Sequence, residues 1–410
     1  MARVASDSGA SDMTLPRGLP PSRACPVCAQ SHASVMQSMR FALPDGHPLP
    51  DAYDVIVCRA CGAVYADTSA LQSDYDRYYA ELSKYSDVAT GTGAGQQAWD
   101  RDRLHSAASW IAETLGRKDA RIVDIGCANG GLLDEFRELG FSALTGVDPS
   151  PACVAAVTAS GMQGHVGTLF DLPNAVKGAD CVILSHVMEH VRDVDVALSA
   201  VRGMLEPNGI VYVEVPDATR YAEFIVAPFQ DFNVEHINHF SVATLGNALR
   251  RAGFRVERTI QKSINASATA LYPALGIIAR AAADETEAGD PDLHLEANVS
   301  AYIARSQSAL ESIRTHLNRA LADEPRIIIW GTGQTTLTLL SNLSLRPEIV
   351  ALTDSNPRYH GRRLGGIRVI PPEEVGTLDA PILIGSLISH VAIEARVREL
   401  GLPNRTIRLS

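Results

Sequence analysis

The sequence predicts an α/β protein with two parallel sheets, each flanked by helices, and a small cysteine-containing lobe ahead of them. Three observations predict this fold class. Short apolar runs alternate with helical patterns from residue 121 to 260 and again from residue 326 to 384. A strand, a glycine-containing turn and a helix open each of these two regions. Four cysteines, arranged as two Cys-x-x-Cys pairs, precede the first region.

The composition is that of an ordinary globular protein. The chain has 410 residues, 46% of them hydrophobic, and a net charge of −11. This length allows two to four domains, and the acidic balance argues against a nucleic-acid partner. We find no apolar run long enough for a membrane span, and the first 22 residues lack the apolar stretch of a secretory signal. We therefore expect a disordered leader over residues 1–22, a cytoplasmic location and no membrane partner.

The cysteine pairs predict a metal site. The pairs lie about thirty residues apart and consist of Cys25, Cys28, Cys58 and Cys61. The spacing is typical of tetrahedral Zn²⁺, because two intervening residues let both sulfurs of a pair face one ion. Four thiolates would leave no open coordination position, so we expect a structural zinc in a lobe over residues 23–68. His32 and His47 are the alternative ligands if one cysteine is not used.

The first α/β region is expected within residues 69–262. Its predicted strands are 121–125, 143–148, 179–185, 209–215 and 254–260. Its predicted helices are 97–115, 131–139, 152–160, 194–205 and 242–252. Strands that alternate with helices in this way are typical of a parallel sheet covered on both faces.

The turn after the first strand has two interpretations. It reads Asp124-Ile-Gly126-Cys-Ala-Asn-Gly130, which fits the dinucleotide pattern G-x-G-x-x-G only loosely because Ala128 replaces a glycine. The pattern D-x-G-x-x-x-G fits better, and such a loop cradles the amino-acid end of S-adenosylmethionine, which carries no phosphate. Asp148 ends the next strand, where a carboxylate can bind ribose hydroxyls. S-adenosylmethionine is therefore favoured over NAD.

Further residues extend the predicted cofactor site. An L-F-D-L-P segment places Asp171 where it could hold the adenine amino group. The fourth strand ends in Ser185-His186, followed by Val-Met-Glu189-His190. We expect Glu189 and His190 to cap or pack the following helix. The predicted cofactor-binding residues are Asp124, Gly126, Cys127, Gly130, Asp148, Asp171, Leu172, Ser185 and His186.

The last third of the chain predicts a linker and a second nucleotide-type lobe. Residues 263–324 are expected to be a linker with one long amphipathic helix over 299–321, which could join domains or form a coiled-coil dimer seam. Residues 325–410 are expected to form a smaller Rossmann-like lobe. Its predicted elements are strands 326–330, 349–353 and 381–384, helix 335–345, the turn Gly331-Thr-Gly333-Gln334, and the strand-end acid Asp354. A lone G-x-G is weak evidence for NAD, so we favour a degenerate lobe that helps to bind the substrate.

At the predicted cofactor-binding residues and the segments around them, the middle region resembles the class I S-adenosylmethionine-dependent methyltransferases. It follows their patterns D-x-G-x-x-x-G, strand-two acid, D-L-P, H-V-x-E-H-V and L-x-P-G-G, with Asn208 replacing the first glycine of the last pattern. The resemblance implies a class I methyltransferase Rossmann-like core that binds S-adenosylmethionine.

The whole chain, from Cys25 to Ser410, resembles the three-domain sugar C-methyltransferases that act on nucleotide-linked keto-deoxysugars. Their motif Y-x-E-H-x-x-Y-x-S corresponds here to Asn233-Val-Glu235-His236-Ile-Asn-His239-Phe-Ser241. This resemblance nominates His236 as the general base, with Glu235 beside it. The resemblance and the sequence context also suggest four substrate-binding residues, Tyr79, Asn233, His239 and Gln334.

The expected function is methyl transfer from S-adenosylmethionine to a nucleotide-linked keto-deoxysugar. The base would remove a proton next to a carbonyl, and the resulting enolate would take the methyl group at carbon. One alternative is an O- or N-methyltransferase that acts on another sugar or small metabolite. Another is a non-catalytic ligand-binding module. The sequence leaves open whether the protein is a monomer or a homodimer.

Overall fold

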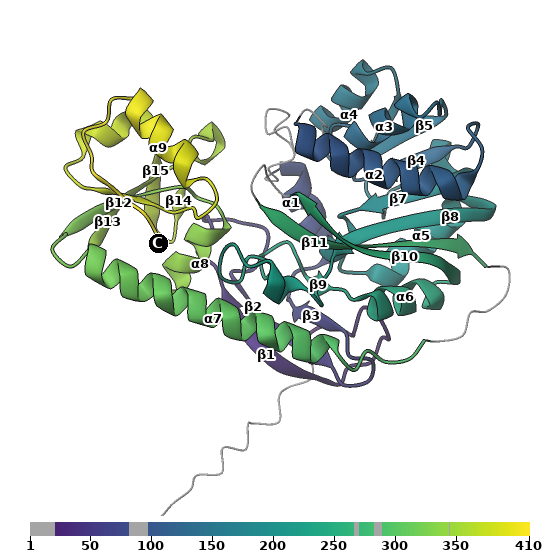
Figure 1. The fold of residues 1–410 in the computed structure, drawn as a ribbon, viewed down its shortest axis with the longest axis horizontal. Helices are drawn as coiled ribbons and strands as arrows, with labels where there is room; N and C mark the ends of the chain where they lie inside the picture. Colours follow the sequence, from purple (N-terminus) through teal and green to yellow (C-terminus); the bar gives the residue numbers. More distant parts are fainter. Residues whose placement is uncertain (1–20, 82–96, 266–269, 283–288, 344) are drawn as a thin grey trace, which may run out of the picture.

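The structure, a computed structural model, describes residues 21–81, 97–265, 270–282, 289–343 and 345–410 (Figure 1). Most of the expected leader lies outside these residues. Within them the chain forms three sheets of four, seven and six strands. The largest sheet belongs to the middle region, and the six-stranded sheet lies apart from it in the C-terminal lobe (Figure 1).

The seven-stranded sheet has the strand order β10-β11-β8-β7-β4-β5-β6. Its strands are β4 (Ile122–Ile125), β5 (Leu144–Asp148), β6 (Gln163–Val166), β7 (Ala179–Ser185), β8 (Leu205–Pro216), β10 (Phe254–Asn265) and β11 (Leu271–Ala281). The strands from β4 to β8 are parallel, and β11 pairs antiparallel with both β8 and β10. The predicted α/β class and the alternation of strands with helices are confirmed for this region.

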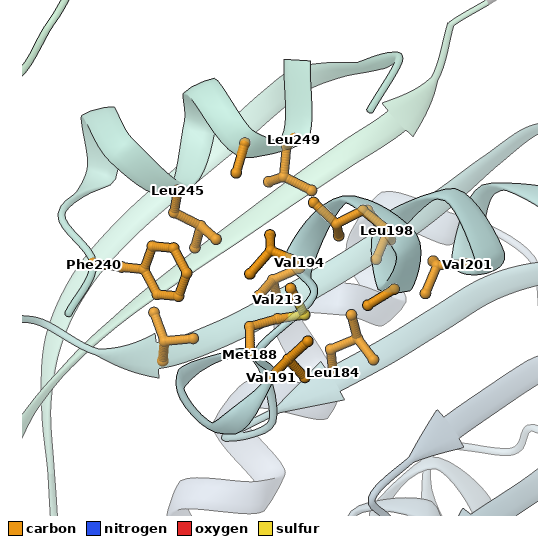
Figure 2. Close-up of a cluster of buried hydrophobic side chains, with 14 of the residues drawn as sticks. Leu184, Met188, Val191, Val194, Leu198, Val201, Val213, Phe240, Leu245 and Leu249 are labelled. Carbon is orange, nitrogen blue, oxygen red and sulfur yellow. The ribbon is translucent and has the colours of Figure 1, made fainter. Parts of the chain in front are cut away.

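Helices cover both faces of this sheet. They are α2 (Ala98–Leu115), α3 (Gly131–Glu138), α4 (Pro151–Ala159), α5 (Val194–Met204) and α6 (Val242–Arg251). Helices α2 and α3 pack on one face, and α5 and α6 on the other. Figure 2 shows the second interface, where Leu198 of α5 and Leu245 of α6 meet the apolar side chains of β7 and β8. Burial of both faces explains why the strands read as short apolar runs.

The predicted linker boundary at residue 263 is too early, because the large sheet continues beyond it. Residues 263–265 and 271–281, predicted to lie outside the core, complete β10 and form β11 inside the sheet. Pro273 and Gly276 disfavour a strand by local propensity. Pairing between β8 and β10 overrides that preference, because most of β11 is buried in the layer.

The N-terminal lobe is a four-stranded antiparallel sheet that includes a strand from the middle region. Its strands are β1 (Ala33–Arg40), β2 (Ala52–Cys58), β3 (Val64–Asp67) and β9 (Asn238–His239), and helix α1 (Gln72–Glu81) follows β3. Strand β9 lies just after the Glu235–His236 motif in the sequence. The lobe is therefore built directly onto the segment that carries the predicted base.

Helix α7 (Leu295–Ala320) joins the lobes and starts four residues earlier than predicted. Figure 1 shows it running from the N-terminal lobe to the C-terminal lobe. Leu295 and Tyr302 pack in the same cluster as β1–β3, whereas Ile313 and Leu317 pack with the C-terminal sheet. This intramolecular burial, rather than a coiled-coil dimer seam, explains the apolar stripe.

The C-terminal lobe has the predicted Rossmann-like character. Its strands are β12 (Arg326–Trp330), β13 (Glu348–Thr353), β14 (Arg363–Leu364), β15 (Ile367–Ile370), β16 (Ile382–Ile384) and β17 (Thr406–Ile407), and its helices are α8 (Gln334–Asn342) and α9 (His390–Glu399). The strand order is β14-β15-β13-β12-β16-β17, with β13, β12, β16 and β17 paired in parallel. Across the described part of the chain, we find no helix with the length and apolarity needed to cross a bilayer.

Candidate functional site

The predicted cofactor loop lies at the carboxyl edge of the large sheet. Strand β4 pairs with β5 on one side and with β7 on the other, so the strand order reverses next to β4. Ligands of open α/β sheets bind at such a reversal, beyond the carboxyl ends of the strands. The loop Gly126–Gly130 and the segment after Ser185 both begin there. The fold thus brings two of the predicted cofactor segments together.

Two glycines give the loop its shape. Gly126 and Gly130 have φ angles of +76° and +81°, in the left-handed region that favours glycine. A Cβ atom at Gly126 would lie 2.7 Å from Cγ2 of Val187, in the segment after β7. This close approach requires glycine and brings the two loops into contact.

Two buried carboxyl groups support the loop. Asp148 accepts hydrogen bonds from the backbone N–H groups of Ala128 (2.9 Å) and Ser150 (2.8 Å). Asp124 is 3% exposed, and burial, followed by the nearby charge of Asp148, raises the pKa of Asp124 to about 7. A positively charged ligand above the loop would lower that pKa, because it would favour the carboxylate form. The pair suits a cationic ligand such as the ammonium or sulfonium of S-adenosylmethionine.

The other predicted cofactor residues differ in what they can offer. Asp171 is exposed, and Leu172 and Ser185 are half-buried. The thiol of Cys127 belongs to the hydrophobic core under the loop, where a Cβ atom at Gly146 would lie 2.7 Å from its sulfur. Cys127 can therefore contribute only its backbone to a ligand on the loop.

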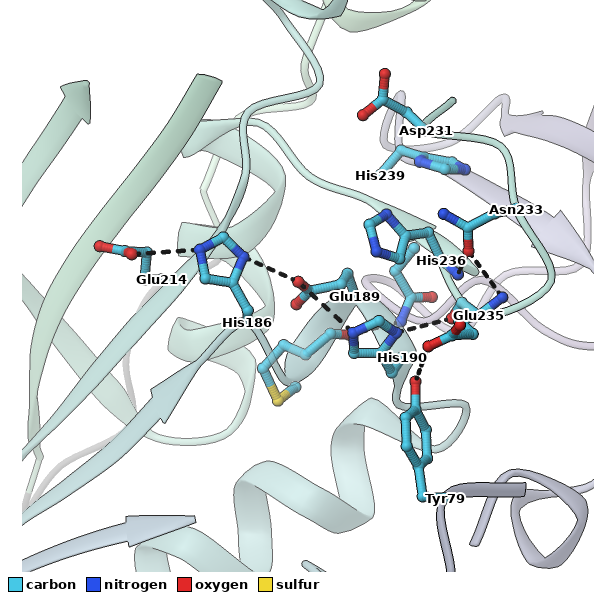
Figure 3. A network of polar contacts seen from close by, with 12 residues as sticks. Tyr79, His186, Glu189, His190, Glu214, Asp231, Asn233, Glu235, His236 and His239 are labelled. Carbon is cyan, nitrogen blue, oxygen red and sulfur yellow. Dashed lines mark hydrogen bonds and ion pairs between the residues drawn. The ribbon is translucent and has the colours of Figure 1, made fainter. Parts of the chain in front are cut away.

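His186 lies between two buried carboxylates (Figure 3). Its Nδ1 is 3.2 Å from Glu189 and its Nε2 is 3.3 Å from Glu214 of β8. Burial lowers the pKa of His186, but hydrogen bonds with Glu189 and Glu214 outweigh that effect and raise it to about 9. Lys262 of β10 lies 2.5 Å from Glu214. This pKa favours the imidazolium form of His186 at neutral pH, held by an ion cluster that extends from the end of β7 through β8 to β10.

This cluster continues to the predicted base. Glu189 lies 3.8 Å from Nε2 of His190, and the rings of His190 and His236 pack edge-on with their centroids 4.9 Å apart. Nδ1 of His190 lies 3.0 Å from the backbone carbonyl of Glu235 and therefore donates to it. One ligand atom from each of Glu189, His190 and His236 lies within 4.8 Å of the others. Such a group could share a proton or a cation.

The carboxylate of Glu235 is held by two tyrosines of α1. The hydroxyl groups of Tyr78 and Tyr79 donate to it at 2.8 and 3.2 Å. The side chain of Asn233 accepts hydrogen bonds from the backbone N–H groups of Glu235 and His236, both at 2.9 Å. Tyr79, Asn233, Glu235 and His236 are therefore brought together, as expected for one acceptor site. Asn233 shapes the loop that presents His236.

The remaining substrate candidates lie on either side of this loop. His239 is 1% exposed, its ring packs against Phe232 and Tyr221, and burial lowers its pKa to about 3. His239 is therefore a neutral histidine of the core. Its imidazole could contact a substrate only if the surrounding aromatic rings moved apart. Gln334, at the start of α8, donates to the backbone carbonyl of Phe232 at 3.5 Å and thus connects the C-terminal lobe to the acceptor loop.

Sequence reasoning missed several residues of this network. Glu189 and His190 were expected only to cap or pack a helix, and Glu214, Lys262 and Asn238 were not considered. The signal for Glu214 was present, since a carboxylate inside the apolar run Val-Tyr-Val-Glu-Val needs a buried partner. No sequence signal identified that partner, because His186 follows β7 and Lys262 lies on β10, both far from Glu214 in the sequence.

The four cysteines converge as predicted. Sulfur atoms of Cys25 and Cys61 are 3.6 Å apart, those of Cys28 and Cys58 are 3.5 Å apart, and all four lie within 4.8 Å of one another. Tetrahedral Zn–S bonds of about 2.3 Å place sulfurs roughly 3.8 Å apart. The cluster fits a zinc ion, and three of the four thiols are buried.

Comparison with known proteins identifies the middle region. Residues 99–259 match the family described as "Methyltransferase domain". The chain contains a methyltransferase domain. The match covers the glycine loop, the segment from His186 to His190, Glu214 and residues 233–241, and it confirms the expectation of a methyltransferase core. Residues 323–408, the C-terminal lobe, match a family described as "C2185-like, N-terminal".

Relatives of the methyltransferase domain are named O-methyltransferases. Ubiquinone biosynthesis O-methyltransferase of Azorhizobium caulinodans is 33% identical over 108 residues, which are 25% of this chain and 42% of that protein. The enzyme of the same name from Pseudomonas savastanoi pv. phaseolicola is 26% identical over 216 residues, 47% of this chain and 89% of that protein. The chain spans about two fifths of the length of the first relatives it matches.

The solved structures to which this chain is similar include methyltransferases. An S-adenosylmethionine-dependent methyltransferase from Mesorhizobium loti is 23% identical, with a TM-score of 0.35, over 43% of this chain and 99% of that one. The 1,6-didemethyltoxoflavin-N1-methyltransferase of Burkholderia thailandensis, solved with S-adenosylhomocysteine, is 18% identical, with a TM-score of 0.39, over 56% of this chain and 95% of that one.

Proposed function

We propose that this protein transfers the methyl group of S-adenosylmethionine to a small-molecule acceptor and that His236 is the general base. One observation carries the proposal: a continuous network runs from His186, at the edge where the cofactor loop lies, through Glu189 and His190 to His236. This network supports an arrangement in which the methyl donor and the acceptor bind to adjoining segments. Proximity of this kind can remove a large part of the barrier to a group transfer.

The residues present support each step that falls to the protein. The glycine loop and the carboxylates of Asp124 and Asp148 would hold the cofactor, which supplies an electrophilic methyl group when bound. The imidazole of His236 would take a proton from the acceptor, since its ordinary pKa lies near neutrality. Glu189 has an oxygen, Oε2, with no hydrogen-bond partner among the described residues, and its charge would stabilise the imidazolium that forms.

We propose further that the acceptor is a nucleotide-linked keto-deoxysugar that is methylated at carbon. The Glu235-His236 motif supports this, as does the Rossmann-like lobe that touches the acceptor loop through Gln334. His236 would remove the proton next to the ketone, leaving its electron pair on carbon and oxygen as an enolate. The carbon then forms its bond to the methyl group while the carbon–sulfur bond breaks, and sulfur leaves as a neutral thioether.

O-methylation is the second candidate, because the relatives of the domain are named O-methyltransferases. The same imidazole would then deprotonate a hydroxyl group. The two candidates are separated by incubating nucleotide-linked keto-sugars with the protein in D₂O, without the methyl donor. Carbon methylation predicts exchange of the proton next to the ketone, whereas O-methylation predicts none.

Activity is tested with a labelled methyl donor and a panel of keto-sugar and hydroxyl acceptors, with products identified by mass spectrometry. His236→Ala should lower turnover by roughly 10²- to 10⁴-fold, the usual contribution of a general base, with little change in cofactor affinity. His316→Ala, in helix α7, is the matched control.

Cofactor binding without any methylated product would favour the ligand-binding alternative. Loss of activity with a chelator that leaves the zinc content unchanged, restored by a divalent cation, would instead favour a metal-assisted role for His236.

We also propose that Cys25, Cys28, Cys58 and Cys61 bind one structural zinc ion. Their sulfur spacing supports this assignment. The ion would stabilise the N-terminal lobe, whose sheet is small and whose cysteines lie in the same buried cluster as the methyltransferase core.

A further inference from the structure

We infer that Asn238 is a positioning residue that holds the His190–His236 pair in place and couples it to the cysteine site of the N-terminal lobe. The inference rests on the proposed role of His236. Asn238 is 1% exposed, and its side chain joins three segments that are distant in the sequence.

The amide of Asn238 fixes the turn that carries Glu189 and His190. Its Nδ2 donates to the backbone carbonyls of Met188 (2.9 Å) and Val191 (2.7 Å), which bracket the two residues. A single amide thus uses both of its N–H groups on one short turn. Because the ring of His190 packs on the ring of His236, the position of this turn sets the position of the base.

The backbone around Asn238 fixes the base from the other side. Ile237, directly after His236, donates to the carbonyl of Glu189 at 2.8 Å and accepts from Ala66 of β3 at 2.9 Å. Asn238 itself pairs with Tyr65 of β3. A one-residue slip of this pairing would turn the side chains of the segment to the opposite face. Strand β3 therefore determines which way His236 faces.

Strand β3 and Arg23 connect this arrangement to the cysteines. The guanidinium of Arg23 donates to Oδ1 of Asn238 at 2.5 Å and lies 5.1 Å above the ring of Tyr65. Arg23 is 5% exposed, and its Nε and Nη1 have no hydrogen-bond partner among the described residues. A buried cation needs compensating negative charge.

The cysteine site would supply part of that charge, because the charge of Cys25 is among those that act on the Arg23 guanidinium. Arg23 stands two residues before Cys25, and β3 starts three residues after Cys61. Zinc bound by four thiolates carries a net charge of about −2. The cysteines also share one buried cluster with Tyr65, Met188 and Val191. Occupation of the site therefore stabilises Arg23 and β3, and through Asn238 it orders the acceptor residues without contact to the cofactor loop.

Two substitutions separate the contacts of Asn238. Asn238→Asp keeps an acceptor for Arg23 but removes both donors to the turn, whereas Arg23→Gln removes the buried cation and leaves the Asn238 donors. For Asn238→Asp we expect kcat to fall roughly 10²-fold, the loss that a misplacement of about 1 Å can cause. Binding of S-adenosylhomocysteine, measured by calorimetry, should remain within twofold of wild type. Arg23→Gln should give a smaller loss of the same kind.

A second measurement does not depend on the acceptor or on His236. Hydrogen–deuterium exchange, followed by mass spectrometry, is compared for the zinc-loaded protein and for protein from which zinc has been extracted. We expect segments 188–191 and 233–241 to exchange faster after extraction, while segment 122–130 at the cofactor loop is unchanged. Asn238→Asp should produce the same faster exchange with zinc still bound.

Two outcomes would overturn the inference. One is unchanged exchange of segments 188–191 and 233–241 after zinc extraction and in Asn238→Asp. The other is a uniform loss of protection that includes segment 122–130, which would mean that the variant is globally unfolded rather than mispositioned. Faster local exchange in a protein that shows no methyl transfer would instead refute the proposed function and leave the coupling intact.

Discussion

Nε2 of His186, the residue directly after β7, lies 3.3 Å from the carboxylate of Glu214 on the neighbouring strand β8. Glu214 is fully buried and also contacts Lys262 and the hydroxyl of Tyr212. Burial raises the pKa of Glu214, but the hydrogen bond from His186 and the charge of Lys262 outweigh it, and its pKa lies below the ordinary value. The two groups are charged partners in the folded protein.

The charge of His186 makes stability depend on pH. Its pKa is about 9 in the folded protein, compared with an ordinary value of 6.5. Its stabilising effect is therefore complete below pH 6.5 and is lost as the pH rises through 9. We expect this loss to be on the order of 3 kcal/mol. The free energy of unfolding, measured with urea at several pH values, should fall with rising pH in wild type and change less with pH in His186→Gln. The control variant is His165→Gln. An equal dependence on pH in wild type and His186→Gln would contradict the raised pKa of His186.

Removal of the charge of Asp148 should weaken cofactor binding. In Asp148→Asn the backbone N–H groups of Ala128 and Ser150 lose a charged acceptor, and a hydrogen bond to a charged group contributes about 1.5 to 3 kcal/mol. We expect the dissociation constant of S-adenosylhomocysteine to rise by roughly 10- to 100-fold. Calorimetry gives this value directly. Asp171→Asn, at an exposed position, should have a smaller effect, and the reverse order of the two variants would argue against the loop as the cofactor site.

The cysteine cluster predicts metal content and a metal-dependent stability. Purified protein should contain one zinc ion per chain, measured by plasma mass spectrometry, and Cys58→Ser should bind it less tightly. Because binding to the folded state alone stabilises that state, extraction of zinc should lower the unfolding temperature. The matched control is Cys181→Ser, which changes a buried cysteine outside the cluster. Full zinc occupancy in Cys58→Ser would mean that another residue, such as His32, completes the site.

Glu235 should matter less for catalysis than His236. Its carboxylate accepts hydrogen bonds from the hydroxyl groups of Tyr78 and Tyr79, so both of its oxygens already have partners within the protein. A double-mutant cycle with Glu235→Gln and Tyr78→Phe should give a coupling free energy of about 1 to 3 kcal/mol in unfolding experiments. Turnover in Glu235→Gln should exceed that of His236→Ala. A larger loss in Glu235→Gln would make the carboxylate itself the base.

Local sequence patterns predicted much of the fold because they are short-range. The apolar strand runs, the glycine turn at Gly126 and the Cys-x-x-Cys pairs each reflect a requirement of neighbouring residues. The boundary near residue 263 was wrong for the opposite reason. Strand β11 contains Pro273 and Gly276, and its place in the sheet depends on β8 and β10, not on its own composition.

Local patterns along the chain were enough to predict the α/β class, the glycine loop with its strand-end acids, the cysteine pairs and the Glu235–His236 motif. The surroundings of these features follow from the way the chain packs. This packing placed His186 between Glu189 and Glu214, occupied Glu235 with two tyrosines, buried His239 in an aromatic cluster and made Asn238 the link between two lobes. The physical reason is that charge pairing and burial depend on groups that meet only after strands far apart in the chain have been assembled.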